Sequence, residues 1–228
     1  MKTTYEKLDE IPFELKADQV LKGLRLRQSN ATIERMVRRM VEEAADVARP
    51  KAIYAVSAVS NKHENWLEID GVKFTSRIMR VNFDQLNRVF PYVVTCGTEV
   101  DAVKAPDGDL LGSFCLDAIK VHLMGTAMRY MTAHVKRKFD LGKTSFMNPG
   151  SLADWPITQQ RPLFSLFPDV EKAIGVRLTP SCMMQPLKSG SGIMFTTETG
   201  YENCQFCPRE DCPGRRALYD PAMFSKYA

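Results

Sequence analysis

The sequence predicts an α+β fold in which a mixed or antiparallel sheet is flanked by helices. Two observations favour this class: long helical segments at 31–49 and 108–139, and strand-like runs that do not alternate regularly with them. The 228 residues contain no internal repeat and no low-complexity linker, so we expect one compact unit. Within it we distinguish a helix-and-sheet half, 1–140, from a loop-rich half with a cysteine cluster, 141–228.

The two helices are expected from apolar residues that recur at the spacing of a buried helical stripe. For the helix at 31–49, Asn30 is positioned as the N-cap and Pro50 as the stop. The helix at 108–139 is the longest periodic segment of the chain. Its expected stripe consists of Leu111, Phe114, Cys115, Ala118, Ile119, His122, Met124 and Met128.

Strands are expected where short apolar runs are rich in β-branched and aromatic residues. The run at 52–59 is the first, and the pair Asp70-Gly71 between two alternating runs at 66–74 indicates a β-hairpin. Residues 82–90 are expected to form a short helix that leads into a strand at 92–97.

The texture of the sequence changes in the second half. Residues 142–169 contain four prolines and have weak periodicity, which predicts an ordered loop with short helical turns. Residues 175–181 and 192–197 are expected to form strands on either side of a turn that contains Cys182.

Composition and charge exclude several classes of partner. The net charge of +4 comes from Lys and Arg spread along the chain, so no nucleic-acid groove is indicated. No apolar run approaches 18 residues and the N-terminus is charged, so we expect neither a membrane span nor a secretory signal. A cytoplasmic location follows as an expectation, and there clustered cysteines more often bind metal than form disulfides.

Three cysteines near the C-terminus form the pattern C-x2-C-x4-C. The two-residue gap between Cys204 and Cys207 lets both thiolates reach one ion, and Cys212 follows closely. Cys182 is the nearest remaining cysteine and is our choice for the fourth ligand. All-thiolate ligation suits an iron–sulfur cluster, which we expect as [4Fe–4S], and also zinc, which is the alternative. Reduced thiols or a disulfide would leave the two Cys-Pro pairs unexplained.

The basic pair Arg215-Arg216 follows the last of these cysteines. It is open to two interpretations. The pair contacts acidic groups of a partner or a cofactor phosphate, or it is simply solvated.

The stretch "GVRLTPSCMMQPLKSGSGIMF" resembles part of the activation domain of cobalamin-dependent methionine synthase. Upstream, "NPGSLADWP" lies where that domain carries its Pro-Gly-Tyr loop, and "ARPKAIYAV", "TCGTEV" and "LDAIKVHLMG" resemble stand-alone relatives. The resemblance thus covers most of the chain and implies an activation-domain-like fold. The residues that match the pattern in the first stretch are Gly175, Leu178, Thr179, Ser181, Pro186, Ser189, Ser191 and Gly192.

The sequence departs from the family at the loop that holds S-adenosylmethionine. In the family, an arginine stands four residues before a Gly-Tyr pair, and these positions fall on Phe146 and Ser151 here. Only Pro149 and Gly150 remain. A guanidinium for the cofactor carboxylate and an aromatic wall are therefore missing, which argues against S-adenosylmethionine.

The resemblance implies an accessory protein of a corrinoid-dependent methyl-transfer system, whose partner is a corrinoid-binding protein or methyltransferase. The cysteine cluster adds reductive activation or electron transfer, with a redox partner. Two alternatives remain open: a non-catalytic module that binds a corrinoid protein and holds structural zinc, and a reactivation enzyme that binds S-adenosylmethionine. The residues expected to border the docking or ligand pocket are Asn148, Pro149, Gly150, Asp154, Lys188, Ser189, Ser191 and Tyr201.

Overall fold

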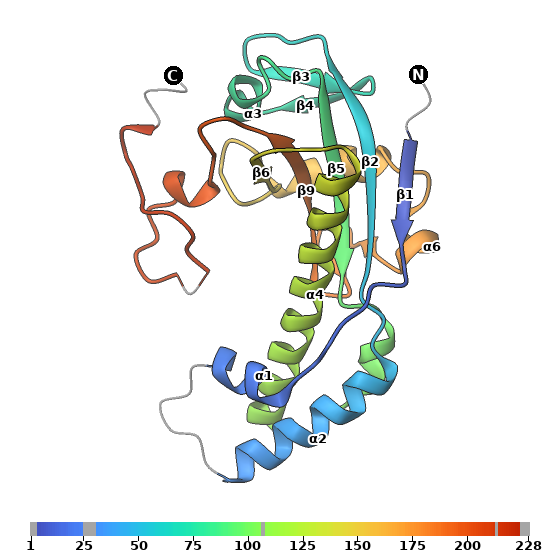
Figure 1. Cartoon of the computed structure of the whole chain (residues 1–228). Coiled ribbons are helices and arrows are strands. Elements are labelled where there is room, and N and C mark those ends of the chain that lie inside the picture. Colours follow the sequence, from blue (N-terminus) through green and yellow to red (C-terminus); the bar gives the residue numbers. More distant parts are fainter. Residues whose placement is uncertain (1–3, 25–30, 106–107, 213, 224–228) are drawn as a thin grey trace.

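A computed structural model shows the α+β fold that the sequence predicts (Figure 1). Asn30, the expected N-cap, lies outside the described residues. The structure describes the whole chain except residues 1–3, 25–30, 106–107, 213 and 224–228.

A seven-stranded antiparallel sheet forms the centre of the molecule. The strand order is β4-β3-β2-β5-β9-β6, and β1 pairs with the first half of β2. Strands far apart in sequence are therefore neighbours, because β9 lies between β5 and β6. The strands are β1 Thr4–Leu8, β2 Lys51–Ser60, β3 Trp66–Ile69, β4 Val72–Thr75, β5 Arg88–Thr95, β6 Thr144–Met147 and β9 Ser189–Thr196.

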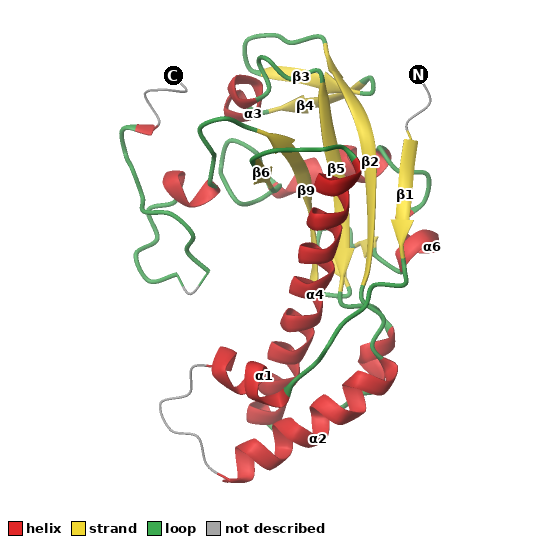
Figure 2. Cartoon of the chain, viewed as in Figure 1, coloured by secondary structure: helices red, strands yellow, loops and turns green. Residues whose placement is uncertain are grey.

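The helices lie around this sheet, and the longest of them, α4, runs from the sheet down to α1 and α2 (Figure 2). The helices are α1 Ala17–Leu24, α2 Ala31–Val47, α3 Arg77–Asn82, α4 Leu110–Lys138, α5 Gln160–Ser165 and α6 Val170–Ile174. Short elements are the 3-10 turns η1 Glu99–Ala102, η2 Ile157–Gln159 and η3 Asn203–Phe206, and the small hairpin β7 Arg177–Leu178 with β8 Met184–Gln185.

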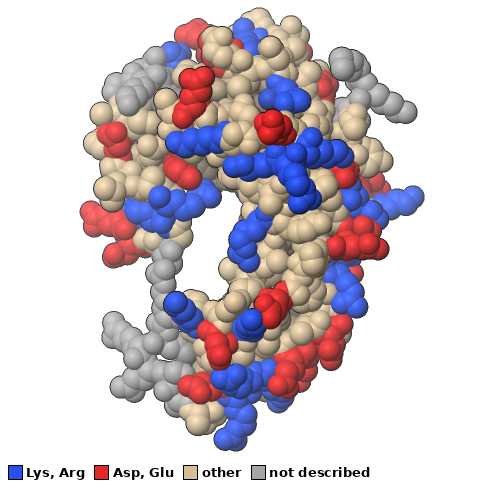
Figure 3. Space-filling view, viewed as in Figure 1, with Lys and Arg blue, Asp and Glu red and all other residues tan. Residues whose placement is uncertain are grey.

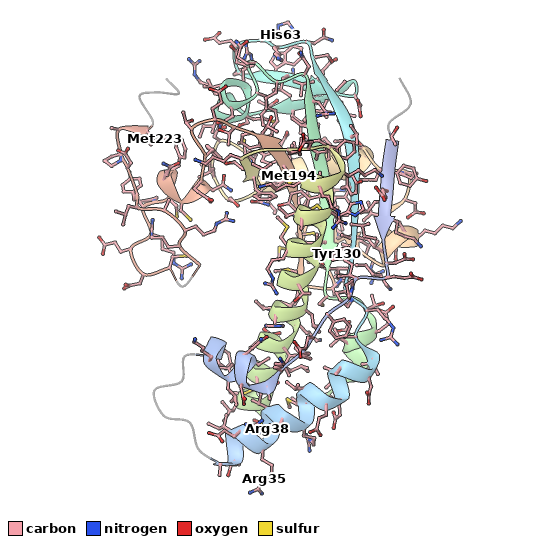
Figure 4. The ribbon with its side chains drawn as sticks, viewed as in Figure 1. Arg35, Arg38, His63, Tyr130, Met194 and Met223 are labelled. Carbon is pink, nitrogen blue, oxygen red and sulfur yellow. The ribbon has the colours of Figure 1, made fainter. Side chains whose placement is uncertain are left out.

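The two faces of the sheet pack against different partners, because successive side chains of a strand point to opposite faces. On β9, Met194 belongs to a cluster with Met131 of α4, and Figure 4 labels Met194 next to one end of this helix. The neighbouring Ile193 and Phe195 belong to a larger cluster that contains Trp155. Residues of β9 therefore contact both layers.

Helix α2 and the hairpin confirm two of the expected elements. The buried residues of α2 include Ile33, Val37 and Met40. In the hairpin turn, Asp70 and Gly71 have φ values of 48° and 79°. These positive angles are what a two-residue turn of this kind requires.

Two other expectations need correction. The helix expected at 82–90 is wrong, because α3 spans Arg77–Asn82 and β5 begins at Arg88; the Ser76 side chain caps α3 by accepting a hydrogen bond from the Met79 N–H. The loop expected at 142–169 has the expected short helical turns, η2 and α5, but it also contains strand β6.

Helix α4 confirms the expected helix at 108–139 but not all of its buried stripe. Cys115 and Ile119 are fully buried, whereas Leu111 is 38% and Phe114 is 52% exposed. The buried face is rotated because α4 packs on the sheet along its second half. By length and composition alone α4 could cross a membrane, a test that core helices also pass, and here it packs against β2 and β5.

Candidate functional site

Asn148, the first residue after β6, ties together three strands at the edge of the sheet. Its Nδ2 donates hydrogen bonds to Oη of Tyr92 at 2.7 Å and to the carbonyl of Ser191 at 2.8 Å. Gly192 makes this approach possible. A Cβ there would overlap the carbonyl oxygen of Met147 and lie 2.6 Å from Nδ2 of Asn148. The predicted site residues Asn148 and Ser191 are thus in contact.

The same network continues on the other face of β9. The Ser191 hydroxyl donates to Oε1 of Gln160 at 2.8 Å, and Nε2 of Gln160 donates to the Cys182 carbonyl at 3.1 Å. Cys182 is buried and has a φ of 63°, in the left-handed region that few residues other than glycine adopt. Gln160 therefore holds the turn of Cys182 against the sheet.

The C-terminal chain reaches the site through Asn203, whose Nδ2 lies 3.4 Å from Oδ1 of Asn148. Asn203 is only 7% exposed, and its Oδ1 has no hydrogen-bond partner in the part of the chain that the structure describes. A buried acceptor without a partner is unfavourable unless water or a ligand reaches it. Burial also raises the pKa of Tyr92 to about 12, so its phenol next to Asn148 is neutral at neutral pH.

Tyr201 is buried in the core, and its role at a ligand pocket stays a prediction. Its N–H donates to Oγ of Ser145 at 2.9 Å, and its ring lies 6.0 Å from that of Phe195. Tyr201 shares the larger core cluster with Phe206 and Met223, and Figure 4 labels Met223 in this C-terminal part. These three side chains attach the C-terminal chain to the main core.

Residues 203–217, which we call the cysteine segment, carry Cys204, Cys207 and Cys212, all half-buried. The N–H of Arg216 donates to Sγ of Cys204 at 3.4 Å. This hydrogen bond is the main reason why the pKa of the Cys204 thiol is lowered. The segment starts with η3, where the N–H of Glu202 donates to Oε1 of Gln205 at 3.1 Å.

The four predicted metal ligands are not gathered in this structure. Among the residues described, no three His, Cys, Asp or Glu side chains are grouped so as to hold a metal ion. Cys204, Cys207 and Cys212 lie on one short segment, whereas Cys182 lies in the turn that Gln160 holds. The donor type fits a thiophilic metal, but the arrangement would have to close around it, so the ligand set stays a prediction.

The loop residues Pro149, Gly150 and Asp154 follow Asn148. Pro149 is buried and Gly150 has a φ of 82°. The carboxylate of Asp154 accepts hydrogen bonds from the N–H groups of Arg77 and Ile78, both at 3.1 Å, and so caps the start of α3. Its role as a ligand contact stays a prediction.

Lys188 and Ser189 lie at the start of β9, away from Asn148. Nζ of Lys188 is 2.9 Å from Oδ2 of Asp117 on α4, and Lys188 lines a cavity of about 470 Å³. The Ser189 hydroxyl donates to the Pro186 carbonyl at 2.8 Å. Their role at the border of a ligand pocket stays a prediction.

Sequence reasoning missed Tyr92, Gln160 and Asn203 as members of the network. Their hydrogen-bond partners lie on strands and loops far away in sequence, so no local motif indicates these contacts. Figure 3 shows an opening between the C-terminal chain and the part of the molecule that contains α4.

The comparisons with known proteins concern the fold. No protein-family model and no curated protein matches the sequence. A solved structure of the MetH reactivation domain bound to AdoHcy matches with a TM-score of 0.59 and 14% identity, over 89% of this chain and 82% of that chain. This chain therefore has the α+β fold of the MetH reactivation domain, as the resemblance in its sequence implies.

Proposed function

We propose that the chain is an accessory protein of a corrinoid-dependent methyl-transfer system, which docks on a corrinoid-binding protein or methyltransferase. The match to the MetH reactivation domain carries the proposal, because it extends over 89% of this chain and 82% of that domain. A match of that extent concerns most of the fold and not one shared motif, so the proposed role is an analogy drawn from the fold.

The cysteine segment supports a further part of the proposal, a bound metal. Cys204, Cys207 and Cys212 offer thiolate sulfur, the ligand that both iron–sulfur clusters and tetrahedral zinc take. The hydrogen bond from Arg216 to Cys204 Sγ favours the thiolate form that metal binding needs. The fourth thiolate is assigned to Cys182, whose turn the Gln160 network joins to the same edge of the sheet.

We favour a [4Fe–4S] cluster over zinc for this site. When bound, such a cluster supplies single electrons, and one electron reduces a Co(II) corrinoid to Co(I). The contact between Asn203 and Asn148 would hold the cysteine segment at this edge of the sheet. A separate redox partner would deliver the electron. With zinc instead, the same fold would act as a non-catalytic module that grips the corrinoid protein.

A second candidate, binding of S-adenosylmethionine, is favoured by the AdoHcy that the MetH reactivation domain binds. The buried, unpartnered Oδ1 of Asn203 beside Asn148 would suit a polar group of such a ligand. Phe146 speaks against it. Its ring packs edge-on against Tyr92, with 5.8 Å between centroids, where the family has an arginine. A carboxylate would find no guanidinium there.

Metal analysis after anaerobic purification tests the proposal. We expect brown wild-type protein with about four iron and four sulfide per chain. Cys207→Ala should lose most of this metal, because one thiolate of the knuckle is gone. Cys115→Ala is the matched control, since Cys115 is buried in α4 and should leave the metal content unchanged.

The other outcomes separate the parts of the proposal. Wild-type protein with one zinc and no iron would favour the non-catalytic module. Full metal content in Cys207→Ala would contradict the ligand set. The docking role is tested by sedimentation of the chain with a corrinoid protein from the same organism. Two independent species at about 100 µM each would contradict that role.

A further inference from the structure

The cavity that Lys188 lines lies far along β9 from Asn148 and takes no part in the network described above. Residues of η1 and α4 and residues of α6, β7 and β8 line it. Its volume of about 470 Å³ falls within the range of about 300–1,000 Å³ that is usual for small-molecule sites. The charged residues that line it are Asp101, Asp117, Glu171, Lys120, Arg177 and Lys188.

Four of these six residues neutralise one another in pairs. Nζ of Lys120 donates a hydrogen bond to Oδ1 of Asp101 at 2.6 Å, and Nζ of Lys188 lies 2.9 Å from Oδ2 of Asp117. The two lysine side chains are only 18% and 27% exposed. These pairs therefore give the lining no excess charge of either sign.

Glu171 and Arg177 are the two charged lining residues that form no ion pair within the part of the chain that the structure describes. Nε of Arg177 donates to Oε1 of Gln185 at 3.1 Å, which fixes the guanidinium and leaves its two Nη groups for a ligand. Both side chains are exposed, so a ligand can reach them from solvent.

Gly175 explains why these two side chains share one cavity. It ends α6 with a φ of 76°, and its N–H donates to the Glu171 carbonyl at 2.8 Å. The chain turns at this left-handed residue, so the last turn of α6 and the start of β7 line the same space. A Cβ at Gly175 would lie 3.3 Å from Cγ2 of Thr98, which also lines the cavity.

We propose that this cavity binds a free amino acid, whose carboxylate is held by the guanidinium of Arg177 and whose ammonium group is held by the carboxylate of Glu171. The planar fork of an arginine matches a carboxylate in geometry and charge. A lining with equal numbers of positive and negative groups favours a zwitterion over a ligand of one sign. The inference goes beyond the proposed function and depends neither on a metal nor on a corrinoid partner.

Ligand-observed NMR with the full-length chain tests the proposal, with each of the amino acids found in proteins as a probe at up to about 20 mM. Two charge-assisted contacts in an open cavity should give a dissociation constant of about 5 mM for the best of them. Its N-acetyl derivative lacks the ammonium group and its amide lacks the carboxylate. Each should bind about 10-fold more weakly, because a hydrogen bond between charged groups is lost. A residue inside a polypeptide lacks both charges, so these derivatives separate a free amino acid from a peptide segment.

Two variants assign the contacts. Arg177→Gln and Glu171→Gln should each weaken binding of the amino acid about 10-fold. Arg177→Gln should leave the affinity for the amide unchanged, and Glu171→Gln should leave that for the N-acetyl derivative unchanged, because the partner group is already missing there. Lys172→Gln is the matched control, since Lys172 is exposed on α6 and does not line the cavity.

The absence of saturable binding by every amino acid tested would overturn the proposal. So would an affinity that neither Arg177→Gln nor Glu171→Gln changes, because the ligand would then bind elsewhere. Where circular dichroism finds Arg177→Gln unfolded, Arg177→Lys decides, since it keeps the charge but loses the planar fork. These outcomes leave the proposed docking and metal binding untouched.

Discussion

At the scale of single residues, Asn148 could be predicted as a site residue from the sequence, but its hydrogen-bond partners could not. The resemblance pointed to the loop that starts at Asn148, and the structure places this residue in a hydrogen-bond network. Its partners Tyr92 and Asn203 could not be predicted, because nothing in their local sequence records that β5 and the C-terminal chain meet at β6. The contacts of Arg215 could not be predicted either. Its guanidinium donates to the backbone carbonyls of Cys204 and Cys207, and every residue has such a carbonyl.

Gly192 gives the first residue-scale prediction. A Cβ at this position would meet Met147, Nδ2 of Asn148 and, at 2.9 Å, Oη of Tyr92. Gly192→Ala should therefore lower the free energy of unfolding by about 1–3 kcal/mol, the usual effect of overpacking. Urea unfolding measures it. Gly142→Ala is the control, since nothing lies within 4 Å of that Cβ. Equal free energies of unfolding for the two variants would contradict the prediction, because β6 and β9 would then move apart at little cost.

At the scale of elements, periodic segments were predictable and short paired ones were not. Helix α2 repeats its apolar spacing over 17 residues, so the pattern distinguishes a helix from a strand clearly. Strand β6 has four residues, and its register is set by β9, some fifty positions away in sequence. Helix α3 depends on the cap at Ser76, and Asp154, from a distant loop, also contacts its first turn.

The junction of β1 with α4 depends on Glu6. Nζ of Lys138 on α4 lies 2.7 Å from Oε2 of Glu6, and Tyr54 and His134 also contact its carboxylate. Burial alone would raise the pKa of Glu6, but these hydrogen bonds outweigh it and lower the pKa from 4.5 to about 2. The folded state therefore holds this carboxylate in its charged form.

The pH dependence of stability follows from this lowered pKa. The contribution of Glu6 is fully present above pH 4.5 and is lost as the pH falls towards about 2. Glu6→Gln should lower the free energy of unfolding at pH 7 by about 1 kcal/mol, a value reduced because the carboxylate is partly exposed. Urea unfolding at pH 7 and pH 2 measures the change, with exposed Glu10→Gln as control. A Glu6→Gln effect of equal size at both pH values would contradict the role of the charge.

At the scale of the whole molecule, the fold was predictable although 14% identity leaves few shared residues. Gly175 and Gly192 belong to the pattern on which the resemblance rests. Gly175 has a positive φ of 76° after α6, and Gly192 lies where Asn148 approaches β9 closely. The arrangement of the cysteines was not predictable, because spacing describes a segment but not the distance from Cys182 to it. The opening between the C-terminal chain and α4 also depends on how the whole chain folds (Figure 3).

Ligand binding is the prediction that belongs to this scale. We expect calorimetry to detect no saturable heat with S-adenosylmethionine or AdoHcy at about 1 mM. The sequence resemblance places Phe146 where the family has an arginine, and loss of a charged hydrogen bond costs about 1.5–3 kcal/mol. Titration of AdoHcy into the MetH reactivation domain is the positive control. A saturable isotherm with this chain would favour the reactivation enzyme instead.

The attachment of the cysteine segment to the core has a thermodynamic consequence. Tyr201, Phe206 and Met223 flank or belong to the chain that carries the three cysteines, and all three are part of the larger core cluster. Metal binding to this segment, as proposed above, would therefore be linked to folding of the domain. A metal at 100 times its dissociation constant would add about 2.7 kcal/mol to the free energy of unfolding. A chelator should then lower the melting temperature of the entire domain and not only release its tail.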